Sequence, residues 1–222
     1  ALPIYNEPEE GPLHTTLKLS RKGETLQLTH TNGQTLIDSI HYTSQKNDIS
    51  YGRDPNDPDR WLYMLTPSPF KTNISKDAAL GISSEPNFSH QEGFHPSPLS
   101  MKIVAPAGAT IYYTLDGADP DETNRLVYET PLNISSNTVV RATVSLPNHL
   151  ESETVTKTFF INEKSTLPVV SLTMDPYWLY DEDDGIHTNW EDDYEVPGHI
   201  EYFPDNERKF HPSVVKDSFT VA

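Results

Sequence analysis

The chain has 222 residues, of which 35% are hydrophobic and 22% charged, with a formal net charge of −17 and no cysteine. The negative charge argues against nucleic acid and anionic membrane surfaces as partners, because both recruit Lys and Arg. Without cysteine there are no disulfides, no thiol catalysis and no thiolate metal sites. No apolar run approaches the roughly 18 residues of a transmembrane helix, so we expect no membrane insertion.

The first third of the sequence is typical of short antiparallel strands. Residues 1–12 are rich in Pro and Glu and indicate an extended arm, and strand-like alternation begins at Leu13. Asn32-Gly33 between two such runs is a strong hairpin signal. The return strand is expected over residues 35–42, and the apolar residues 61–63 are expected to pack back onto the hairpin.

Four blocks of this region occur in an order that resembles the second half of the bacterial lamin-tail domain. They are residues 13–20, 23–26, 50–53 and 66–69. That family is an immunoglobulin-like β-sandwich, and its opening strands with their acidic, tryptophan-containing motif are missing here. The resemblance therefore implies either a truncated sandwich or one completed by a partner strand, since a lone half-sandwich exposes sheet edges and an apolar face.

The middle of the chain predicts a β-sandwich, because short strand signals recur between turn clusters. The expected strands cover residues 99–104, 110–115, 126–128, 138–145 and 153–161. In the fourth, alternation places Val140, Ala142 and Val144 on one face, with Arg141 and Thr143 on the other.

One stretch of this region carries a second resemblance. A tyrosine-containing strand over residues 110–115 runs into the turn Asp116-Gly117-Ala118-Asp119-Pro120, and a hairpin follows. The pattern resembles the chitobiase/β-hexosaminidase C-terminal type domain over roughly residues 85–162. That family is an immunoglobulin-like sandwich appended to many secreted enzymes and surface proteins, and is not their catalytic part. The resemblance implies an extracellular, non-catalytic module.

The last third predicts a buried strand over residues 165–173, a short helical turn capped by Asp175 with Pro176 at its first position, and a strand over residues 198–203. Residues 167–172, 185–186 and 200–203 resemble the entry segment of the spore-coat protein H family. Known members are atypical protein kinases. After Phe203 only 19 residues remain, without a phosphate-binding lysine or metal-ligating acids, so no catalytic residue is carried over.

These expectations combine into an all-β chain of immunoglobulin-like modules with an irregular acidic C-terminal segment. A partial lamin-tail-like module is expected over residues 1–75 and a chitobiase C-terminal-like sandwich over residues 76–162. A spore-coat-H-like entry segment lacking a kinase lobe is expected over residues 163–222.

Two groups of carboxylates are candidate calcium sites. Asp181, Asp183 and Asp184 precede Gly185 at high density but without the alternating spacing of an EF-hand loop. A solvated acidic loop is the favoured interpretation, and Ca²⁺ that offsets the like-charge repulsion is the alternative. The weaker group is expected to consist of turn formers rather than ligands: Asp116, Asp119 and Asp121. We expect no other cofactor.

The sequence holds no metalloprotease motif, no nucleophile elbow and no Gly-rich phosphate loop. We therefore expect no enzyme, but a structural or adhesive module of a bacterial extracellular or cell-surface protein that assembles with protein partners or with itself. One alternative is an accessory-domain fragment of a spore-coat-H-like kinase. The other is a carbohydrate-binding module with a sugar-stacking platform built from aromatic residues: Tyr112, Tyr113, Trp61, Trp178 and Trp190.

Overall fold

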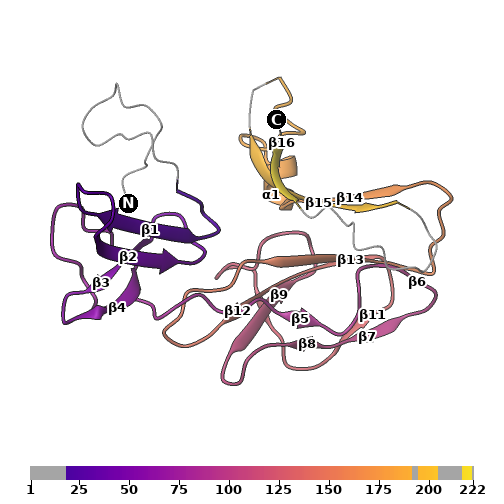
Figure 1. Ribbon diagram of the computed structural model, residues 1–222. Coiled ribbons are helices and arrows are strands. Elements are labelled where there is room, and N and C mark those ends of the chain that lie inside the picture. The colour runs from indigo at the N-terminus through magenta and orange to yellow at the C-terminus, as the bar shows by residue number, and fades with distance from the viewer. Residues whose placement is uncertain (1–18, 192–194, 205–216, 222) are drawn as a thin grey trace. The chain divides into compact units, whose positions relative to one another are not determined.

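A computed structural model describes residues 19–191, 195–204 and 217–221, the last group as backbone only (Figure 1). The expected N-terminal arm and the alternation over residues 13–18 lie outside the described residues. The elements are β1 (Glu24–Thr29), β2 (Leu36–Tyr42), β3 (Ser50–Asp54), β4 (Asp57–Met64), β5 (Asn87–Phe88), β6 (Gly93–His95), β7 (Leu99–Met101), β8 (Ile103–Val104), β9 (Thr110–Thr114), β10 (Leu126–Val127), β11 (Leu132–Ile134), β12 (Thr138–Ser145), β13 (Val155–Ile161), β14 (Val169–Thr173), α1 (Pro176–Tyr180), β15 (Val196–Phe203) and β16 (Asp217–Val221).

The predicted all-β class is confirmed. The one helix among the described residues, α1, has five residues, so none of the described helices is long and apolar enough to cross a membrane. The chain divides into two compact units, and the boundary falls between Gly81 and Ile82. They are called the N-terminal unit and the C-terminal unit.

The N-terminal unit is built from two antiparallel hairpins, β1–β2 and β3–β4. The first turn is the predicted one: the Asn32 side chain accepts hydrogen bonds from the backbone N–H groups of Gln34 and Thr35, and Gly33 takes a φ of +69°. Tyr63 of β4 is buried, and its hydroxyl donates to the Ser44 carbonyl just after β2. β4 thus contacts the segment that leaves β2, and the packing of residues 61–63 onto the hairpin itself stays a prediction.

The C-terminal unit is a β-sandwich. Its larger sheet has the order β10-β9-β12-β13-β6, and the pairs β11–β7 and β5–β8 lie across the core from it (Figure 1). Val140, Ala142 and Val144 of β12 are fully buried in that core beside Phe159 of β13, which confirms the face assigned to them from alternation.

The single strand expected over residues 99–104 is wrong, since it is interrupted at Lys102. The backbone N–H of Lys102 donates to the Ser89 hydroxyl instead of a neighbouring strand. On either side of this break the chain changes partner, because β7 pairs with β11 and β8 pairs with β5.

A further sheet, β14-β15-β16, packs on the outer face of β13. The Thr158 hydroxyl lies 2.8 Å from the Ser171 hydroxyl and donates to the carboxylate of Glu201, a fully buried residue. Next to this polar contact the rings of Phe160 and Phe203 meet edge to face, with centroids 5.4 Å apart. The sequence pattern does not indicate β16.

The predicted burial of β14 is wrong, although the strand itself forms. Val170 is 56% exposed and Leu172 53% exposed, because only alternate side chains of the strand turn toward the sandwich. The helical turn that follows is confirmed, since the Asp175 carboxylate accepts from the Tyr177 N–H and Pro176 occupies the first helical position.

The core predicts a large cost for truncating its central ring. We expect Phe159→Ala to lower the free energy of unfolding of the C-terminal unit by about 3–5 kcal/mol, because it removes a fully buried aromatic side chain and leaves a cavity. Val127→Ala, at a residue that is 53% exposed, should change it by no more than about 0.5 kcal/mol. Urea denaturation of both variants measures the difference, and equal effects would contradict the assigned core.

Candidate binding groove

The N-terminal unit carries an open groove of about 480 Å³. One wall comes from the β1–β2 hairpin and the other from β3 and β4, and residues just before β1 and just after β2 close the ends. Its apolar lining consists of aliphatic and aromatic side chains: Leu19, Leu26, Ile40, Tyr42, Ile49, Tyr51 and Trp61.

Strand register places these side chains together. Leu26 lies opposite Ile40 in the β1–β2 ladder, so the two share the face that turns to the groove. In the second hairpin Arg53 lies opposite Trp61, and Tyr51 lies two residues away from Arg53 on the same face. The rings of Tyr51 and Trp61 are consequently neighbours, with centroids 5.4 Å apart.

The hydroxyl of the buried residue Tyr42 fixes the segment that leads into β1, at one end of the groove. Tyr42 donates to the Ser20 carbonyl at 3.1 Å and to the Glu24 carboxylate at 2.7 Å, and Glu24 also accepts from the Ser20 N–H. Burial, together with Glu24, raises the pKa of Tyr42 to about 12. The Tyr42 hydrogen bond in turn lowers the pKa of Glu24. The Tyr42 hydroxyl thus holds both Ser20 and Glu24 against β2, and the Ser20–Glu24 hydrogen bond joins these two residues to each other.

The aromatic wall is held in one orientation. The Arg53 guanidinium lies 4.8 Å from the centre of the Trp61 ring and donates to both carboxylate oxygens of Asp38, at 2.8 and 2.9 Å. The same ion pair lowers the pKa of Asp38. Trp61 therefore presents a preorganised ring, because Tyr51 and Arg53 contact it from neighbouring positions.

The two units differ in charge. Residues 1–81 contain eight Lys and Arg and ten Asp and Glu, a net charge of −2, whereas residues 82–222 contain eight and 23, a net charge of −15. The charged residues that line the groove are Arg21 and Lys46. The groove therefore joins an apolar wall to a basic rim on the less acidic unit of an acidic protein.

The acidic stretch after α1 folds on itself. The Asp181 carboxylate accepts from the backbone N–H groups of Asp183 and Asp184, which makes a local turn. The Asp184 carboxylate accepts from the Tyr177 hydroxyl at 2.6 Å, and that bond raises the pKa of Tyr177 to about 12. Two of the three candidate calcium ligands are thus engaged in shaping the loop.

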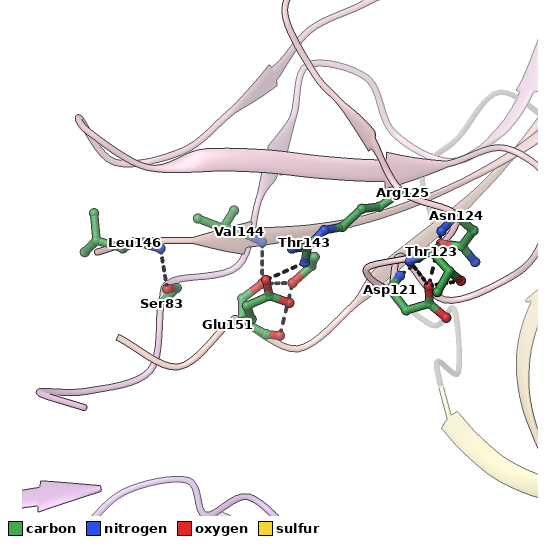
Figure 2. A network of polar contacts seen from close by, with 10 residues as sticks. Ser83, Asp121, Thr123, Asn124, Arg125, Thr143, Val144, Leu146 and Glu151 are labelled. Carbon is green, nitrogen blue, oxygen red and sulfur yellow. Dashed lines mark hydrogen bonds and ion pairs between the residues drawn. The ribbon is translucent and has the colours of Figure 1, made fainter. Parts of the chain in front are cut away.

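The second acidic group is spread over separate partners. Asp116 accepts from the Ala118 N–H, and Asp119 pairs with Arg141 at 2.6 Å. Figure 2 shows Asp121 accepting from the backbone and hydroxyl of Thr123 and from the Asn124 N–H. The Thr123 hydroxyl is the main cause of the lowered pKa of Asp121.

In the part of the chain that the structure describes, no group of three or more His, Asp or Glu side chains is placed to hold a metal ion. Calcium at either acidic group stays a prediction. Calcium bound by residues 181–184 would raise the melting temperature above that in chelator, since a ligand that binds only the folded state stabilises it. Asp183→Asn, which keeps the backbone contact to Asp181, should then abolish the shift. Wild-type melting curves that superimpose with Ca²⁺ and with chelator would contradict a calcium site at these residues.

The five aromatic residues proposed as a sugar platform have different neighbours. Arg125 covers Tyr112 at 3.8 Å, Tyr113 meets Tyr128, and Trp178 meets Tyr177. Trp190 is 76% exposed, while Trp61 belongs to the N-terminal unit and its groove. Sequence reasoning singled out Trp61 but missed its groove neighbours. The one signal available was the pairing of aromatic residues across the second hairpin.

A comparison with known families finds a match within the sandwich. The family model described as Fn3 associated matches residues 101–159, which run from the end of β7 into β13 and include most of the core strands. No curated protein matches the chain. The match supports a fibronectin-type-III-associated, immunoglobulin-like domain in the middle of the chain. The lamin-tail, chitobiase-type and spore-coat-H resemblances stay predictions.

The contacts at Ser20 predict an acid-sensitive groove. The pKa of Glu24 is lowered below its ordinary value of 4.5, so its contribution to stability is complete above about pH 4.5 and is lost as the pH falls through the folded-state value. We expect Glu24→Gln to speed amide exchange in β1 at pH 7, with the difference from wild type shrinking below pH 4. Asp48→Asn, at an exposed residue, is the matched control. A pH-independent difference would contradict the role of the charge.

Proposed function

We propose that this chain is a non-catalytic structural module of a bacterial extracellular or cell-surface protein. In this proposal the sandwich of the C-terminal unit is a rigid spacer, and the groove of the N-terminal unit docks an extended segment of another chain. The observation that carries the proposal is the groove itself, an apolar and aromatic cleft on a unit made of two small hairpins.

The hairpins support an extended occupant. Among the described residues β1 and β2 pair only with each other, so this ladder has an outer edge with backbone groups available to a further strand. In the second hairpin the outer edge of β4 is already bonded to Ala79 at Tyr63. Strand addition at such an edge takes its affinity from main-chain hydrogen bonds and its specificity from alternate side chains. Leu26 and Ile40 would receive those side chains on the groove wall.

The rim supports an acidic occupant. Because Arg21 and Lys46 are the charged residues of the lining, a segment that alternates apolar and carboxylate side chains matches the groove in both polarity and charge. A neighbouring copy of this acidic protein and a different acidic protein both meet that description, and both agree with an adhesive or assembling module.

A carbohydrate-binding module is the second candidate, favoured by the fixed orientation of Trp61 between Tyr51 and Arg53. An aromatic ring held in this way offers a flat apolar face to a sugar ring. A glycan array is the direct test, and saturable binding of a neutral oligosaccharide that is lost in Trp61→Ala would favour this candidate over strand docking.

The accessory-domain fragment of a spore-coat-H-like kinase stays the enzyme-class alternative. A reading frame that continues into a lobe with a phosphate-binding lysine and metal-binding aspartates would favour it.

Strand docking predicts binding of a simple probe. We expect a labelled, N-acetylated octapeptide alternating valine and glutamate to bind the full chain saturably in fluorescence anisotropy. Leu26→Glu should weaken binding at least tenfold, because it places a negative charge on the apolar wall that receives the acidic peptide. Ile37→Glu, at a residue of β2 that is 57% exposed and outside the groove lining, is the control. Equal effects of the two substitutions, or no saturation, would overturn the proposal.

A further inference from the structure

A second cleft, of about 610 Å³, lies within the C-terminal unit. It opens between the turn after β9, the first residues of β12, and the end of β14 with α1. One lining residue, Asp116, belongs to the turn whose aspartates form the weaker candidate calcium group. In the cleft this carboxylate lies beside apolar side chains rather than in a cluster of acidic ones.

The walls of the cleft are fixed in place. Gly117 takes a φ of +92°, and a Cβ added there would lie 2.9 Å from the Met174 carbonyl oxygen, so the turn packs directly against the end of β14. The Asp116 side chain is oriented by the N–H of Ala118, and α1 is fixed by its Asp175 cap. A ligand entering here meets a surface that needs little reorganisation.

The lining combines exposed apolar side chains with a carboxylate. Leu115, Leu172 and Tyr180 line the cleft and are 45%, 53% and 63% exposed, which is unusual for three large apolar residues gathered at one hollow. Asp116 lies among them. A lysine or arginine side chain suits this combination, because its aliphatic stem packs on apolar groups while its cation pairs with a carboxylate or an aromatic ring.

The strand beside the cleft offers a backbone edge. β14 pairs with β15 along one edge, and no described strand pairs with its other edge (Figure 1). On the outward face of the sheet Val170 lies opposite Tyr202 and Leu172 opposite Ile200, and Val170, Leu172 and Tyr202 are exposed. An added strand with alternating side chains would continue this apolar face.

Charge favours a cationic partner over a neutral or acidic one. Residues 82–222 carry a net charge of −15, and the acidic stretch 181–184 follows directly after Tyr180 at the cleft. Such a field raises the local concentration of cations and speeds their association. The groove of the N-terminal unit, with its basic rim, has the opposite preference.

We propose that the free edge of β14 and the adjoining cleft bind an extended segment of a partner protein that alternates basic and apolar side chains. The segment pairs with β14, covers Val170 and Leu172, and places one lysine or arginine side chain between Tyr180 and the Asp116 carboxylate. The site goes beyond the docking groove proposed above, since it lies on the other unit and selects the opposite charge.

The probe for this site is a labelled, N-acetylated octapeptide alternating valine and lysine, titrated into the full chain in fluorescence anisotropy. We expect saturable binding that weakens as salt is raised from 50 to 300 mM, a range in which surface charge interactions are progressively screened. Hydrogen exchange of the complex should show protection of the β14 amides. The valine–glutamate peptide should bring no protection to β14.

Three substitutions locate the contact. Asp116→Asn keeps the side-chain oxygen that caps Ala118 but removes the charge, and should weaken binding at least fivefold. Leu172→Ala should weaken it by a similar factor, because it removes apolar surface beside the edge. Leu126→Ala, at a residue of β10 that is 52% exposed and outside the cleft, should have no effect.

Several results would overturn the proposal. Equal protection of the β14 amides by both peptides, unchanged affinity of the valine–lysine peptide in Asp116→Asn and Leu172→Ala, or protection confined to β1 would each do so. Displacement of the peptide by a neutral oligosaccharide would assign the cleft to a sugar instead. Leu26→Glu, which disables the groove of the N-terminal unit, should leave valine–lysine binding intact. Failure of one site is thereby distinguishable from failure of the other.

Discussion

The period-two alternation of β12 is the constraint on which the C-terminal unit depends, because its two faces are committed to different tasks. The inward face places Val140, Ala142 and Val144 in the core. The outward face carries Arg141, whose guanidinium donates to the Gly117 carbonyl and the Thr156 hydroxyl. One strand therefore seals the sandwich and also holds the turn that lines the cleft, and a one-residue slip in register would lose both.

Among its described residues the N-terminal unit has no strand in a comparable position. Its buried apolar side chains cluster at the end of β4, around Leu62, Tyr63 and Met64, while the first hairpin exposes Leu28 and Ile37. Two-stranded sheets are marginal when isolated, and this unit consists of two of them among its described residues. Among the described residues, apolar side chains that the hairpins leave partly exposed, such as Leu26, also line the groove. A docked strand would be the ligand of the groove and would also bury apolar surface of the unit.

Local patterns in the sequence predicted what local physics decides. The alternation of β12, the Asn32-Gly33 turn and the capped start of α1 depend on neighbours a few residues away, and all three form as expected. The predicted burial of β14 is wrong, because the sequence of an apolar strand is similar whether one or both of its faces are covered. The groove draws Leu26, Ile40 and Trp61 from separate stretches, so only the fold brings them together. The acidic residues looked like clusters because sequence distance says nothing of the partners, such as Arg141, that separate them.

The parallel pairing of β6 with β13 has a consequence for how the molecule forms. It joins Phe94 to Phe160 in one ladder, and the ion pair of Lys157 with Glu92, 65 positions away in the chain, lies beside it. The Ser83 hydroxyl joins residues that are similarly far apart in the sequence, because it accepts a hydrogen bond from the Leu146 N–H, 63 positions away (Figure 2). Non-local pairings are entropically slow to close. During synthesis β6 therefore has no pairing partner until β13 has left the ribosome. In that interval the unpaired edge of β6 can bind a chaperone or pair with a wrong strand.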